Sequence, residues 1–133
     1  PKLKEYMSSQ IQYARENGFV STLLKRRRYL KDINSQNAIV RGAAERTAIN
    51  APVQGSAADI IKLAMIRIDK KIYEEKLQSR MILQVHDELV FDVPKEEKNI
   101  LSNIVKIEME NALELEVPLV VDIGMGNNWL EAH

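Results

Sequence analysis

The chain contains no cysteine among its 133 residues, which excludes a disulfide-stabilised scaffold and any metal site built on thiolate ligands. It has no apolar run of the roughly 18 residues that a membrane-spanning helix needs. It has no excess of either charge, since 19 basic residues balance 19 acidic ones. This balance argues against a freestanding histone-like or membrane-surface protein.

The chain also lacks an initiator methionine and begins at Pro1, directly before a helical pattern, so we expect its natural start to lie upstream. What is present is an ordinary globular composition, with 45% hydrophobic and 29% charged residues. A chain of this length and composition is typical of one domain with a single core.

Hydrophobic periodicity predicts an N-terminal helix over residues 2–17 that stops at Gly18. A strand over 19–24 and its return over 28–30 follow as a hairpin. A second helical pattern over 36–49 is interrupted at Asn50-Ala51-Pro52, and a new helix is expected from there, because proline fits the first turn of a helix better than its interior. Ser56 and Asp59 resemble a capping arrangement near that start.

The second half of the chain predicts a tight hairpin of strands 81–85 and 89–93, a long helix after Pro94 and a last strand over 118–123. Together the elements indicate an α+β fold, with a small, mainly antiparallel sheet and helices packed on one face.

Three ionisable residues, His86, Asp87 and Glu88, separate the two strands of this hairpin. An exposed carboxylate at the tip of a rigid hairpin is a suitable oxygen ligand for Mg²⁺. A two-metal site, with its ions about 3.5–4 Å apart, needs more bridging carboxylates than Asp87 and Glu88 supply. Polar residues at a hairpin tip are also typical of a solvated turn, and an isolated histidine is more often structural than catalytic.

A second polar set recurs every four residues at Arg46, Asn50 and Gln54. On a helix these side chains share one face, from which amide and guanidinium donors can reach the minor groove of a duplex. There, similar acceptors at every base pair allow pairing geometry to be tested without reading the sequence. A solvated helix face is the alternative. The basic run Lys25–Arg28, with Lys31 nearby, is a weaker indication of phosphate contacts.

The two sets of polar residues lie in two longer stretches, ERTAINAPVQGSAADIIKLAM (Glu45–Met65) and QVHDELVFDVP (Gln84–Pro94). Together they resemble the C-terminal part of a family A DNA polymerase. The resemblance covers essentially the whole chain, including RRRYLKDINS at positions 26–35. Lys31 departs from it, because many relatives have proline there, and we expect this change to affect only a turn.

The resemblance implies a role for each site residue. Asp87 matches a ligand of the catalytic Mg²⁺ ions at the centre of the polymerase palm, Glu88 a supporting carboxylate and His86 a residue near the primer 3′ end. Arg46, Asn50 and Gln54 match side chains that contact the primer–template duplex. The implied partners are primer–template DNA and deoxynucleoside triphosphates, and the implied cofactor is Mg²⁺.

The resemblance also implies that parts are missing, including the strand with the second metal-binding aspartate and the nucleotide-binding fingers helix. We therefore expect residues 1–133 to form one C-terminal piece of a polymerase domain, without thumb or exonuclease domains and inactive alone. The complete enzyme is expected to be a monomeric, bacterial, cytoplasmic protein at the nucleoid, and the isolated piece to self-associate. Two rival hypotheses are a non-catalytic nucleic-acid-binding module with a palm-like fold and a magnesium-dependent nuclease that uses Asp87 and Glu88.

Overall fold

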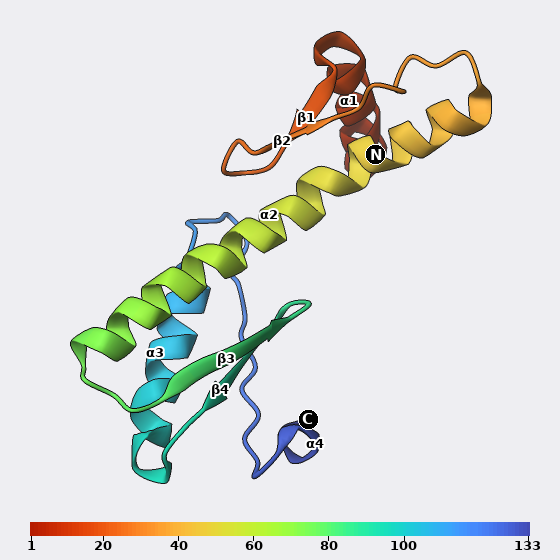
Figure 1. Cartoon of the computed structure of the whole chain (residues 1–133). Coiled ribbons are helices and arrows are strands. Elements are labelled where there is room, and N and C mark those ends of the chain that lie inside the picture. The colour runs from red at the N-terminus through yellow and green to blue at the C-terminus, as the bar shows by residue number, and fades with distance from the viewer. The chain divides into compact units, whose positions relative to one another are not determined.

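The computed structural model describes all 133 residues, which form two compact units, Pro1–Asp59 and Ile60–His133. The elements follow in the order shown in Figure 1: α1 (Lys2–Asn17), β1 (Phe19–Ser21), β2 (Arg27–Tyr29), α2 (Ala38–Glu74), β3 (Arg80–Val85), β4 (Glu88–Asp92), a 3₁₀ turn (Lys95–Glu97), α3 (Lys98–Glu110) and α4 (Trp129–Ala132). The mixed α/β fold class is confirmed. The strands, however, form two separate two-stranded antiparallel sheets, β1–β2 and β3–β4, and not one larger sheet.

The first unit begins with the predicted helix. Gly18 ends α1 in the left-handed conformation, with φ 80°, and its N–H donates to the carbonyl of Ala14 at 2.7 Å. Glycine adopts this conformation without the steric cost that a side chain brings, which explains the stop. The buried cluster of this unit joins α1, the hairpin and the first half of α2: Ala14, Val20, Leu30, Ile33, Ala44 and Ala48.

The predicted hairpin after Gly18 is confirmed, with a first strand shorter than expected and a second strand that begins one residue earlier. The loop spans residues 22–26 and is closed by a hydrogen bond from Thr22 N–H to the carbonyl of Arg26 at 2.9 Å. Lys25 takes the left-handed conformation in this loop, with φ 67°, so the turn forms without the glycine that usually serves there.

The predicted helix break at residues 50–52 is wrong. Helix α2 runs without interruption from Ala38 to Glu74, with Pro52 inside it, and Figure 1 shows it as one long coil. An interior proline removes one backbone hydrogen bond and costs roughly 3 kcal/mol. Packing offsets this cost, because Ala44 and Ala48 are buried before the proline and Ala64 and Ile68 after it. Ser56 and Asp59 consequently cap no helix start.

In the second unit, helix α3 and the last part of α2 pack against one face of the β3–β4 hairpin. Its buried cluster comprises Ala64, Ile68, Leu101, Val105 and Ala112, with strand residues such as Met81, Leu89 and Phe91 packed against it. The hairpin is antiparallel, with Met81 opposite Phe91 and Val85 opposite Glu88, and a bulge lies between Met81 and Leu83. The predicted helix after Pro94 is confirmed by α3.

The predicted last strand is wrong. Residues 118–123 have no regular secondary structure, because a strand exists only where its backbone pairs with another, and β3 pairs with β4 alone. The chain becomes regular again at α4, where the Asn128 side chain accepts a hydrogen bond from Glu131 N–H. None of the helices is long and apolar enough to cross a membrane.

Candidate functional site

The carboxylate-bearing hairpin belongs to the second unit. Strands β3 and β4 are joined by His86 and Asp87 alone, and Glu88 is the first residue of β4, opposite Val85. All three predicted site residues are exposed. The structure therefore places Asp87 in the tightest part of the turn.

His86 adopts a left-handed backbone conformation, with φ 54°, which is uncommon for residues other than glycine. Two-residue hairpin loops require a positive φ at their first position, where glycine or asparagine is usual. The carbonyl of His86 accepts a hydrogen bond from the Gln84 side chain at 2.6 Å. This conformation of His86 is the one that the two-residue turn requires.

Glu88 is bound from the C-terminus of the chain. Nε2 of His133 lies 2.9 Å from Oε2 of Glu88, and Nδ1 lies 2.9 Å from the carbonyl oxygen of Trp129. Because both partners are acceptors, only the doubly protonated imidazole can donate to both. The hydrogen bond to Trp129 and the nearby Glu88 carboxylate accordingly raise the pKa of His133. The His133 ring also stacks on Trp129, with centroids 4.9 Å apart.

The sequence analysis did not identify His133. The chain holds two histidines, and nothing local to His133 indicates a partner 45 residues away.

The β3–β4 hairpin supplies some of the ligands that a Mg²⁺ ion requires. Asp87 and Glu88 offer carboxylate oxygens, the ligands this ion prefers. No group of three or more side chains suited to holding a metal ion occurs in the chain. The two carboxylates can therefore contribute ligands to a magnesium site without completing one.

The polar set predicted from spacing lies in the first unit. Since α2 is continuous, Arg46, Asn50 and Gln54 do share one helix face, and all three are exposed. The neighbouring Glu45 pairs with Arg15 at 2.7 Å and with Arg41 at 3.7 Å. The face therefore presents one guanidinium and two amides, the donors expected of a surface that meets acceptor atoms in a groove.

The hairpin of the first unit is fixed to α2 by a network that sequence reasoning missed. Asp59 accepts hydrogen bonds from the Thr22 hydroxyl and from Nε of Arg26, both at 2.5 Å. The Ser56 hydroxyl accepts from Leu23 N–H at 3.0 Å. Burial raises the pKa of Asp59, but the hydrogen bonds from Thr22 and Arg26 and the Arg26 charge lower it below its usual value.

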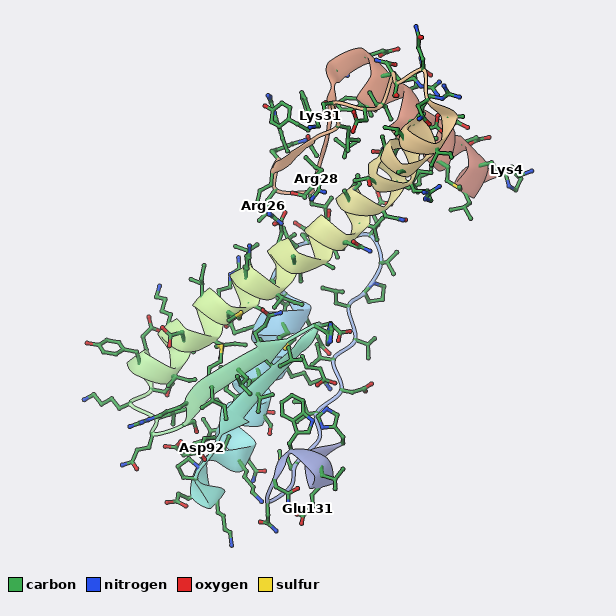
Figure 2. The ribbon with its side chains drawn as sticks, turned by 45° about the vertical axis from the view of Figure 1, so that its right-hand side comes forward. Lys4, Arg26, Arg28, Lys31, Asp92 and Glu131 are labelled. Carbon is green, nitrogen blue, oxygen red and sulfur yellow. The ribbon has the colours of Figure 1, made fainter.

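This network divides the basic run. Arg26 is neutralised by Asp59, whereas Lys25, Arg27 and Arg28 are exposed, as is Lys31. In Figure 2, the labelled side chains of Arg26, Arg28 and Lys31 lie on or next to the β1–β2 hairpin, and Lys4 projects from α1, apart from them. Only part of the run is thus available for an anionic ligand.

The sequence of the chain matches a known protein family. The family model described as "DNA polymerase family A" matches residues 1–131. The chain is 58% identical over 131 residues to DNA polymerase I of Caldicellulosiruptor bescii, a match that covers 98% of this chain and 15% of that protein. It is 54% identical over 132 residues to DNA polymerase I of Geobacillus stearothermophilus, again with 15% of the relative covered.

Among solved structures, the chain resembles the POL domain of Pol1 from M. smegmatis, determined in complex with DNA primer-template and dNTP. The TM-score is 0.95 and the identity 50%, over 98% of this chain and 23% of that one. The chain spans 15% of the length of each of the two DNA polymerase I relatives, or about a seventh.

Proposed function

This chain belongs to DNA polymerase family A, and from that membership we propose that it forms part of the palm region of a DNA-directed DNA polymerase. Residues 1–133 would be one C-terminal piece of the polymerase domain, with the fingers helix, thumb and any exonuclease domain encoded elsewhere in the whole protein. The observation that carries the proposal is the presence, in one chain of this family, of Asp87 in a two-residue hairpin turn and of the exposed face of Arg46, Asn50 and Gln54.

The proposed reaction is template-directed nucleotidyl transfer. The primer 3′-hydroxyl attacks the α-phosphate of a deoxynucleoside triphosphate, and pyrophosphate leaves. Asp87 would hold Mg²⁺, with Glu88 in support, and the bound ion supplies charge neutralisation at the attacking and leaving oxygens. His86 would lie near the primer 3′ end. This chain's contribution to the rate is therefore placement of charge and of the primer.

The helix face would hold the duplex. In the minor groove, adenine N3 and thymine O2 are acceptors at equivalent positions, so the donors of Arg46, Asn50 and Gln54 can bind any correctly paired step. The partners of the whole protein would be primer–template DNA and deoxynucleoside triphosphates, in the bacterial cytoplasm at the nucleoid. Because an aspartate outside this chain is needed to complete the metal site, the isolated chain is expected not to extend a primer.

The test is primer extension by the whole polymerase that contains this chain, with Asp87→Asn compared with Asp92→Asn. Asp92 is an exposed aspartate at the far end of the same hairpin, opposite Arg80 in the register, and it controls for loss of one carboxylate. We expect Asp87→Asn to lower kcat by at least about a hundredfold and Asp92→Asn to leave it nearly unchanged. Equal activity of the two variants would overturn the proposal.

A further inference from the structure

The β1–β2 hairpin and α1 form an aromatic and basic surface that the proposed metal and duplex contacts leave unused. In the register of the hairpin, Phe19 lies opposite Tyr29, and Ser21 lies opposite Arg27. Side chains alternate along a strand, so these four residues share one face, and Arg28 lies on the other. The face has a defined composition: two aromatic rings, a hydroxyl and a guanidinium.

The rings on this face contact one another. The centroids of Phe19 and Tyr29 are 5.6 Å apart, and Tyr13 of α1 meets Phe19 edge to face at 5.9 Å. The Arg27 guanidinium lies over the Phe19 ring, 4.2 Å from its centroid. This cation–π contact holds the positive charge at the surface of the aromatic group.

The surface is open to solvent and concave. Tyr29 is 69% exposed and Tyr13 is 42% exposed, so both rings are accessible from solvent. A shallow pocket of about 460 Å³ on this face is lined by Gln10, Tyr13, Phe19, Ser21, Lys25 and Arg27. Its lining includes two cations and no carboxylate, so it favours an anionic ligand.

The surrounding sequence strengthens that preference. Residues 18–31 include five basic residues and no acidic one. Asp59 neutralises only Arg26, the basic residue that the network on α2 engages. Of the remaining four positive charges, Lys25 and Arg27 therefore lie beside the exposed aromatic rings. Proteins that bind single-stranded nucleic acids combine these two features, since cations follow the phosphates and bases stack on aromatic faces.

We infer that this surface binds a single-stranded segment of DNA, with Lys25 and Arg27 on phosphates and one base stacked on Tyr29. The inference rests on the proposed function, which supplies an unpaired template strand as the natural ligand. It goes beyond that function by assigning a subsite to residues of α1 and the β1–β2 hairpin. The ligand is recognised by its backbone charge and base faces, so little sequence preference is expected.

The test is fluorescence anisotropy of the purified chain with a labelled oligothymidylate, at several salt concentrations. Tyr29→Leu should weaken binding roughly tenfold, because stacking on one aromatic ring is lost. Arg27→Gln should weaken binding severalfold and reduce the slope of log K against log salt by about 0.7, the value for one phosphate contact on a single strand. Arg28→Gln is the matched control, since it removes the same charge from the opposite face, and it should change the affinity less than twofold.

The outcomes are distinct. Equal effects of Arg27→Gln and Arg28→Gln, or an unchanged affinity of Tyr29→Leu, would overturn the inference. Binding of thymidine monophosphate as tightly as the oligonucleotide would also overturn it, because a strand contacts several groups at once. If a Tyr29 variant loses its thermal transition, Tyr13→Leu tests the same rings from α1.

A blunt duplex without a single-stranded end separates this inference from the proposed function. Binding of the oligonucleotide without the duplex supports the single-strand surface and counts against the duplex face of α2. Binding of the duplex without the oligonucleotide overturns the surface and leaves the proposed function standing.

Discussion

The Nε atom of Arg26 lies 2.5 Å from Oδ1 of Asp59, joining the loop of the first hairpin to the middle of the longest helix. The Asp59 side chain is 2% exposed, and the Arg26 side chain is 51% exposed. The same guanidinium also donates to the carbonyl of Gly55 at 3.2 Å. The pair therefore satisfies a buried carboxylate while it holds the basic loop against α2.

Replacement of Asp59 by asparagine should destabilise the first unit by roughly 1.5–3 kcal/mol, the range for hydrogen bonds to a charged group. The pKa of Asp59 is lower in the folded state than its usual value. Its contribution is thus present above the unfolded pKa of about 3.9 and is lost as the pH falls through the folded pKa. Denaturant unfolding at neutral and acidic pH should show this loss in the parent and not in Asp59→Asn. Asp32→Asn, at an exposed position, is the control, and an equal acid response of both variants would contradict the assignment.

Gly55→Ala should destabilise the same contact. A Cβ atom at Gly55 would lie 2.5 Å from Cγ2 of Thr22, whereas at Gly42 its nearest neighbour would be Nη1 of Arg46 at 3.6 Å. Overpacking typically costs about 1–3 kcal/mol, and alanine in an unobstructed helix gains about 0.5–1 kcal/mol over glycine. Thermal melts should therefore move down for Gly55→Ala and up for Gly42→Ala. If the melting temperatures of both variants move in the same direction, the contact between a Cβ at position 55 and Thr22 does not destabilise the chain.

Pro52→Ala should stabilise the chain, by up to about 3 kcal/mol. Alanine restores an N–H that can donate to the carbonyl four residues earlier in a helix that is already continuous. Chemical denaturation would measure the gain. A loss of stability would mean that α2 requires a bend at this position.

Magnesium binding by the isolated chain should be weak. Asp87 and Glu88 supply only part of a ligand set, so we expect amide resonances near Asp87 to shift in NMR spectra at millimolar Mg²⁺ and not at micromolar Mg²⁺. Asp87→Asn should remove these shifts, and Asp92→Asn should retain them. Tight micromolar binding would show that this chain holds a complete site.

The isolated chain should self-associate through the β3–β4 hairpin. Ile82 is 54% exposed and Leu83 is 51% exposed, and β3 has an edge without a partner strand. Exposed apolar edge strands favour pairing between molecules. Analytical ultracentrifugation should show a concentration-dependent mass that Leu83→Lys lowers. A strictly monomeric parent at high concentration would refute the prediction.

The sequence predicted the elements that short-range patterns define. Helix α1 and its stop at Gly18 follow from apolar spacing and one left-handed position. The β3–β4 hairpin follows from two apolar runs around a polar turn, and the exposed face of Arg46, Asn50 and Gln54 follows from a spacing of four. These features depend on residues within about one helical turn or one hairpin of each other, so they can be read along the chain.

The tertiary structure decided what depends on distant partners. Pro52 was expected to start a helix, and packing on both sides of it keeps α2 continuous instead. Residues 118–123 have an apolar strand-like sequence and form no strand, because no backbone pairs with them. Asp59 binds Arg26 across 33 positions and Glu88 binds His133 across 45. The free energy of such contacts depends on burial and on ordered partners, which packing creates and which no local pattern records.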